Sequence, residues 1–348
     1  MYPSSLHRAI VVPVLGLGLM LPAAIALAQA SQQSFADVPS NHPAYQAVEY
    51  LKVQGIISGY SDGAFRPDKN VNRAEAVKII VAPLIAAGEL PKLTAATYGD
   101  VPIEAWFAPY IEIARAKLGI VDGPPKTTVF YGERPVKKAE FLKMLLLAHK
   151  VDPGAFGEIR LPLALDVTNP DEWYYPYMRY AITASVTMVS SDGLLAPGRE
   201  LTRADVAIFL HRLLMYREGR RTQALLTESE TEIANILDFI GKNDVQNAEL
   251  ASARALLSAR GAHARQPTIP LVQAALKITE SFRTLVRAYR AGVSRQFDDA
   301  IALAGEAWNL AAKGGALHSE LANIAEKVQQ IAKTMADNAR SLKAQVSK

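Results

Sequence analysis

The sequence predicts an all-α protein in two parts: three repeated helix–loop–helix units, followed by an antiparallel helical bundle. Three observations lead to this prediction. One unit recurs three times before residue 216, and a repeat at a fixed period determines the architecture before any local pattern does. After that point, apolar residues follow one another at steps of three and four, the spacing of packed helices. No strand-like alternation interrupts the second half.

The composition is that of a globular protein. The chain has 348 residues, of which 50% are hydrophobic and 21% are charged, enough for two or three domains with apolar cores. It contains no cysteine, which excludes disulfides, thiolate metal ligands and thiol nucleophiles. Its 38 basic and 34 acidic residues give a net charge of +4, which is too small to indicate a nucleic-acid partner.

Residues 1–30 have the pattern of a secretory signal peptide. Arg8 provides a charged start, no charge follows from Ala9 to Leu27, and Ala28-Gln29-Ala30 is a small-x-small cleavage pattern. An uncleaved membrane anchor is the alternative, although Pro13 and the cleavage pattern favour removal. We therefore expect an exported mature chain that starts after residue 30 and has no integral membrane span.

Each repeated unit opens on an Asp-Val dipeptide, continues into an aromatic helix, turns at a glycine-containing loop and closes on a tetrapeptide that starts a second helix. The spacing indicates units at residues 31–95, 96–160 and 161–216, followed by a helical domain at 217–348. The openings are Asp37-Val38, Asp100-Val101 and Asp166-Val167, and the closures are Asn72-Arg73-Ala74-Glu75, Lys137-Lys138-Ala139-Glu140 and Thr202-Arg203-Ala204-Asp205.

Two of the closing tetrapeptides are capping boxes. Asn72 and Thr202 are each followed three residues later by an acid, ahead of an apolar run, which is the pattern that starts a helix. The arginine in the first turn of each helix opposes the helix dipole, because that end favours acids. A nearby anion would relieve this conflict.

The combination of these motifs resembles the surface-layer homology (SLH) domain, in three tandem copies. The resemblance covers Phe35 to Leu214 and is most specific in the first copy, where the loop runs from Gly59 to Pro67. It implies that the repeats pack as a pseudo-threefold unit on an exported bacterial surface protein. It also implies non-covalent binding to cell-wall carbohydrate, often a pyruvylated secondary polymer linked to peptidoglycan.

The resemblance and the residue chemistry together select candidate ligand-binding residues. A guanidinium can meet a carboxylate with two parallel hydrogen bonds, so we expect the two closing arginines to contact the anion, helped by free N–H groups at the helix start. We expect the aspartates to shape the loops and the tryptophans to face sugar or form a wall. The candidate set is Arg73, Arg203, Lys138, Asp37, Asp100, Asp166, Trp106, Trp173, Gly63 and Glu75.

Each candidate also has a purely structural interpretation. The arginines can be solvated first-turn residues, Trp106 and Trp173 can be buried core aromatics, the aspartates can be turn and cap residues, and Gly63 can serve a backbone of positive φ. The copies also differ. Lys138 replaces the arginine in the second copy and leaves only a point charge, and the third copy has Ala184-Ser185-Val186-Thr187-Met188 where the first has Gln54-Gly55-Ile56-Ile57. Three equivalent sites are therefore not expected.

The second half of the chain predicts a bundle of four or five helices. Apolar seams run through Leu271 to Tyr289, Phe297 to Ala311 and Leu317 to Met335. Gly241 and Gly314-Gly315 indicate helix ends. The bundle can associate with a protein partner or with a second copy, or it can simply close its own core.

No catalytic or metal-binding motif is found in the sequence. We expect an anchoring protein rather than an enzyme, with no cofactor, located at the cell surface or wall, on the periplasmic face if the envelope has two membranes. Two alternatives are a structural subunit of a surface layer and a wall hydrolase with its active site in the helical half. The histidines are scattered, at His7, His42, His149, His211, His263 and His318.

Overall fold

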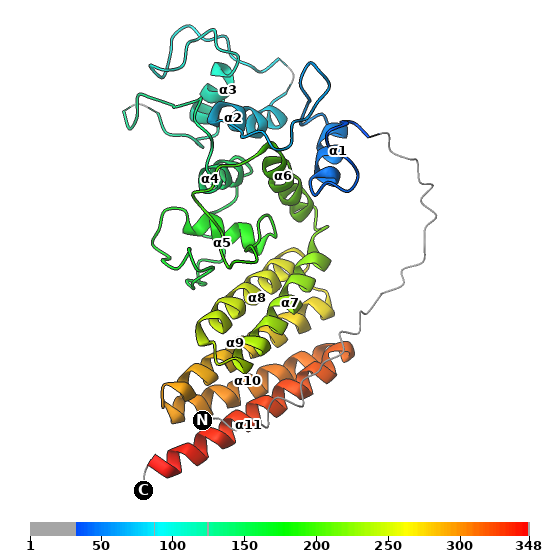
Figure 1. The fold of residues 1–348 in the computed structure, drawn as a ribbon, viewed down its shortest axis with the longest axis vertical. Helices are drawn as coiled ribbons and strands as arrows, with labels where there is room; N and C mark the ends of the chain where they lie inside the picture. The colour runs from blue at the N-terminus through cyan, green and yellow to red at the C-terminus, as the bar shows by residue number, and fades with distance from the viewer. Residues whose placement is uncertain (1–32, 87, 124, 347–348) are drawn as a thin grey trace.

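The computed structural model describes residues 33–86, 88–123 and 125–346, and this part of the chain is built from helices joined by loops (Figure 1). The all-α prediction is confirmed. The predicted signal peptide at 1–30 lies outside the described residues. Within them, no helix combines the length and the hydropathy that a membrane span requires.

The first half contains three pairs of helices, one pair for each predicted repeat. The pairs are α1 and α2, α3 and α4, and α5 and α6, with a 3-10 turn (η2, Ala82–Leu84) after α2 and a π-helical turn (η3, Ile113–Lys117) after α3. Their bounds are α1 (Tyr45–Val53), α2 (Arg73–Val81), α3 (Ala108–Glu112), α4 (Lys138–Ala148), α5 (Tyr175–Thr183) and α6 (Arg203–Arg217).

The closing helices begin where the capping boxes predict. Asn72 Oδ1 accepts a hydrogen bond from Glu75 N at 2.8 Å, and Glu75 Oε2 accepts one from Asn72 N at 3.0 Å. Thr202 caps α6 in the same way. In the second repeat, Lys137 has no side-chain acceptor, and only Glu140 reaches back to the backbone, at 3.2 Å. The start of α4 is therefore capped from one side.

A closed cycle of backbone hydrogen bonds joins the three repeats at their centre. Val71 N donates to Leu201 O at 2.9 Å, Leu201 N donates to Val136 O at 3.1 Å, and Val136 N donates to Val71 O at 2.9 Å. All three side chains are fully buried. Each residue directly precedes a cap residue, so the cycle fixes the starts of α2, α4 and α6 relative to one another. It supports the pseudo-threefold packing, which stays a prediction.

The second half is a run of five helices within the described residues, each antiparallel to the one before it (Figure 1). This confirms the predicted helical bundle. The helices are α7 (Thr222–Gly241), α8 (Val245–Arg265), α9 (Pro270–Val293), α10 (Phe297–Leu317) and α11 (Ala322–Val346), with a 3-10 turn (η4, Ser319–Leu321) before the last.

The glycine signals in this half were only partly correct as helix ends. Gly241 is the last residue of α7, as predicted. Gly314 and Gly315 lie inside α10 instead of ending it. A Cβ on Gly314 would lie 2.9 Å from Ile278 of α9, and one on Gly315 would lie 2.8 Å from Ala325 of α11. These glycines therefore allow close helix packing, a role that their sequence position alone does not distinguish from a stop signal.

The bundle packs directly on the third repeat. An ideal Cβ on Gly261 of α8 would lie 1.8 Å from the carbonyl oxygen of Thr183 in α5, so the two backbones are in direct contact. Beside this contact, Ser185 hydrogen-bonds both Arg221 and Glu228. The apolar core of the repeats continues through this interface into α7, α8 and α9.

Candidate functional site

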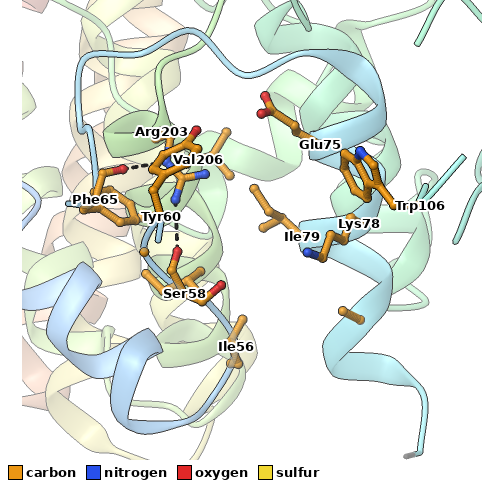
Figure 2. A pocket seen from close by; sticks show the side chains of 14 residues that line it. Ile56, Ser58, Tyr60, Phe65, Glu75, Lys78, Ile79, Trp106, Arg203 and Val206 are labelled. Atoms are coloured by element: carbon orange, nitrogen blue, oxygen red, sulfur yellow. Dashed lines mark hydrogen bonds between the residues drawn. The ribbon is translucent and has the colours of Figure 1, made fainter. Parts of the chain in front are cut away.

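An open groove of about 260 Å³ lies where residues of all three repeats meet (Figure 2). One wall comes from the loop of the first repeat and the start of α6, and the other comes from α2 and from Trp106, two residues before α3. The lining residues are Ile56, Ile57, Ser58, Gly59, Tyr60, Phe65, Glu75, Lys78, Ile79, Ala82, Trp106, Arg203, Val206 and Ala207.

Arg203 is held on the first wall by the loop of the first repeat. Its Nε donates to Phe65 O at 2.7 Å and its Nη2 donates to Ser58 O at 3.1 Å. The guanidinium carbon lies 4.6 Å from the centre of the Phe65 ring and 4.9 Å from that of Tyr60. Nη1 has no hydrogen-bond partner among the described residues. Arg203 is thus fixed in orientation and still has donors to offer.

The opposite wall presents a second cation beside an exposed aromatic ring. Lys78 Nζ lies 5.2 Å from the centre of the Trp106 ring, and 54% of Trp106 is exposed. Glu75 also lines this wall, but its Oε1 accepts from Lys69 Nζ at 3.1 Å while its Oε2 caps the backbone of α2. The acid is therefore already paired, and the groove keeps a positive charge.

The structure brings together three of the predicted site residues: Arg203, Glu75 and Trp106 all line this groove. Sequence reasoning missed Lys78, Tyr60 and the carbonyl of Ser58. A signal for the lysine is present in the sequence, because Lys143 occupies the position in α4 that Lys78 occupies in α2. In the structure, Lys143 Nζ lies 5.8 Å from the centre of the Trp173 ring.

Both tryptophans are exposed rather than buried. Trp106 and Trp173 have 54% and 52% of their surface accessible, and each packs edge-on against the aromatic residue that follows it. The interpretation of these rings as core aromatics is therefore wrong. Each ring instead lies beside a lysine of the preceding closing helix.

Arg73 lies in the equivalent register at the start of α2 but has different neighbours. Its guanidinium carbon lies 4.8 Å from the centre of the Phe130 ring, and its Nε is buried with no hydrogen-bond partner among the described residues. Burial, reinforced by the nearby Arg134, lowers the pKa of the Arg73 guanidinium. Arg73 thus packs on a ring of the second repeat, without the two carbonyl contacts that hold Arg203.

Lys138, the third cation in this register, is not available to a ligand in the way the sequence predicts. It is only 5% exposed, and its Nζ donates to Leu195 O at 2.6 Å. Burial lowers the pKa of its ammonium to about 8. Lys138 therefore links the second repeat to the loop of the third.

The three aspartates clamp the loops of their own repeats. Asp37 accepts from the N–H groups of Phe65 and Arg66 at 2.9 and 2.6 Å. Asp100 and Asp166 make the corresponding pairs of bonds, at 2.6 to 2.8 Å. In each pair the second donor residue has a positive φ, as in Arg66, Tyr131 and Ala196. The carboxylates therefore hold loop conformations that a non-glycine residue seldom adopts.

Gly63 and the helix N-termini also have structural tasks. Gly63 has a φ of +80° at the tip of the first loop and does not line the groove. The N–H groups of Arg203 and Ala204 donate to the carbonyls of Lys69 and Pro67 at 3.0 and 2.9 Å, and the first two N–H groups of α2 and α4 are used alike. The expectation that free N–H groups at the helix start contact the anion is therefore wrong.

One family model matches the first half of the chain three times. The model of the S-layer homology domain matches residues 34–77, 97–142 and 166–207, one match for each repeat. Residues 34–207 carry three SLH domains. The matched ranges supply eleven of the fourteen residues that line the groove, and the other three, Lys78, Ile79 and Ala82, directly follow the first match.

The similar proteins include a surface-layer protein, an anchoring protein and a protein named as a cell wall amidase. S-layer protein EA1 of Bacillus anthracis is 30% identical over 183 residues, which is 52% of this chain and 20% of that protein. A cellulosome-anchoring protein of Acetivibrio thermocellus is 33% identical over 116 residues, 33% of this chain and 26% of that protein. An uncharacterized cell wall amidase of Bacillus anthracis is 25% identical over 181 residues, 52% of this chain and 32% of that protein. The chain covers less than a third of each of these three relatives.

Proposed function

We propose that the SLH repeats anchor this protein at the bacterial cell surface by binding an acidic cell-wall glycan, either a secondary wall polymer or a peptidoglycan-linked polymer. Relatives named as S-layer and anchoring proteins support the surface location. The observation that carries the ligand class is the groove in which Arg203 and Lys78 face an open space beside Tyr60 and Trp106.

The chemistry of the groove suits an acidic sugar. The free Nη donors of Arg203 can bind a carboxylate, such as that of a pyruvyl ketal, with strong charge-assisted hydrogen bonds. The ring of Trp106 can cover the apolar face of a sugar, and Ile79 and Val206 offer further apolar contact between the walls. Arg73 and Trp173 mark a second interface with the same residue types, where we propose a weaker site.

Sedimentation with isolated wall fragments tests the proposal. The full chain should pellet with peptidoglycan that carries its attached polymers, and Arg203→Ala should weaken this binding about tenfold or more, because a charged hydrogen bond contributes about 1.5–3 kcal/mol. Arg73→Ala should weaken it less. Folding of each variant is checked by circular dichroism. Full binding by Arg203→Ala would contradict the proposed site.

A subunit of a surface layer is the second candidate function, favoured by relatives that are themselves S-layer proteins. In that case the bundle of α7 to α11 makes lateral contacts or binds a protein partner. Light scattering of the full chain at increasing concentration distinguishes a subunit that assembles from a monomeric anchor.

We also propose that the chain acts without catalysis, as an exported anchoring module whose residues 1–30 direct secretion. The amidase-named relative makes hydrolysis of peptidoglycan the specific alternative. Zymography of the full chain on peptidoglycan tests it, and a cleared zone would establish the wall hydrolase instead.

A further inference from the structure

The groove holds two cations on opposite walls, and we infer from this arrangement that its ligand is a dianionic glycan unit. By this we mean a saccharide with two separate acidic groups, one bound by Arg203 and the other by Lys78. The inference rests on the proposed function and specifies the ligand class of the same groove. Figure 2 shows the two side chains on opposite sides of the open space, with Ile79 between them.

Neither cation is neutralised by the protein. Arg203 contacts only backbone carbonyls and aromatic rings, and Lys78 makes no ion pair within the described residues. The acid that lines the groove, Glu75, is paired with Lys69. Two positive charges that face the same groove repel each other, and anions bound between them relieve this repulsion. The free groove therefore carries an excess of positive charge that a ligand with two anionic groups balances.

The two cations also differ in what they can recognise. The guanidinium of Arg203 is planar and held by two carbonyls, which suits directional pairing with a carboxylate. The ammonium of Lys78 is a compact point charge on a flexible stem beside Trp106. Because these side chains stand on different walls, one small anionic group is poorly placed to satisfy both. A ligand that spans the groove satisfies each cation with its own acidic group.

The size and lining of the groove fit one or two sugar residues. A volume of about 260 Å³ lies just below the range of about 300–1,000 Å³ that is typical of small-ligand pockets. Both walls also carry apolar residues, Ile79 in α2 and Val206 and Ala207 in α6. These side chains can contact a sugar ring or a methyl group, while the acidic groups of the ligand bind the two cations.

A double-mutant cycle on the full chain tests this assignment. Binding to wall fragments is measured for the wild type, Lys78→Met, Arg203→Met and the double variant, with Lys333→Met on the exposed face of α11 as the matched control. Each single variant at the groove should bind roughly tenfold more weakly, and the double variant roughly a hundredfold, because two separate acidic groups give additive free energies. The Lys333→Met control should bind like the wild type.

The outcomes separate this inference from the proposed function. If Lys78→Met binds like the wild type, or if the double variant binds no more weakly than Arg203→Met, a single acidic group is bound and the dianionic assignment is overturned. If Arg203→Met also binds fully, the proposed function itself fails at this groove. In a second arm, carbodiimide amidation neutralises the carboxylates of the wall fragments and leaves the polymer attached. Amidation should abolish the contribution of Arg203, which is assigned to a carboxylate, and a contribution of Arg203 that survives amidation contradicts the assignment.

Discussion

The first residue of each closing helix in the SLH repeats is a cation, yet the three side chains have different environments. Arg203 faces a groove, Arg73 stacks on Phe130, and Lys138 is buried on the carbonyl of Leu195. The sequence predicts the position and the charge of these residues. It does not predict their exposure, because exposure depends on the loop of the neighbouring repeat.

The buried Lys138 should make stability depend on pH. Its pKa of about 8 in the folded protein lies below the value of about 10.4 for an unfolded chain, so the unfolded state binds more protons between these values. The free energy of unfolding should therefore rise with pH from about 8 to 10.4 through this group. Urea unfolding of the wild type and Lys138→Met at several pH values measures this contribution as the difference between the two proteins. A difference that stays constant across this window would contradict the prediction.

At the scale of the element, the loops between the paired helices depend on carboxylates placed about thirty residues earlier. The Asp-Val repeats are visible in the sequence, and the interpretation of the aspartates as turn and cap residues agrees with the loop hydrogen bonds that they accept. The N–H groups that these carboxylates bind cannot be found from the sequence, because they lie in the loop after the first helix of the repeat, about thirty residues further along the chain. The left-handed backbone at Tyr131 and Ala196 was equally hidden, since neither residue type favours it.

Removing one clamp should destabilise the protein without affecting the groove. In Asp166→Ala, the N–H groups of Leu195 and Ala196 lose their charged acceptor, and the loss should be about 2–4 kcal/mol in the free energy of unfolding. The matched control is Asp171→Ala, whose exposed ion pair with Arg160 contributes about 0–1 kcal/mol. Chemical denaturation measures both. Equal effects of the two variants would show that the clamp is not needed.

At the scale of the whole molecule, the apolar core of the repeats continues across the contact of α5 with α8 into α7, α8 and α9, while α10 and α11 pack on a second apolar cluster. The sequence predicted a repeat half and a helical half, and it predicted the all-α class of both. The sequence does not predict the direct contact of the two halves at Gly261, because a glycine in the middle of a helix does not indicate which segment packs against it. Ser185 illustrates the same limit. It keeps the positive φ that glycine has in the other repeats, and its hydroxyl contacts Arg221 and Glu228 of the bundle side.

Gly261→Ala should therefore destabilise both halves together, because the added methyl group would overlap the carbonyl of Thr183. The matched control is Gly305→Ala in α10, where a Cβ meets open space and alanine should stabilise the helix by up to about 1 kcal/mol. Thermal unfolding is followed by far-UV circular dichroism and by tryptophan fluorescence in a Trp308→Phe background, which reports on Trp106 and Trp173 of the repeats. Both signals should shift to a lower temperature in Gly261→Ala. Separate transitions for the two signals would contradict a shared core.

The triangle formed by Val71, Val136 and Leu201 limits how such a protein can evolve. Each of the three residues donates its N–H to one neighbour and accepts an N–H from the other at its carbonyl oxygen. A chain with two units would therefore leave one buried donor and one buried acceptor without a partner in this cycle. A fourth unit could join only if an existing side were opened. Three is therefore the number of units that closes this cycle, and the added helices of this protein, α7 to α11, follow the third unit and leave the cycle intact.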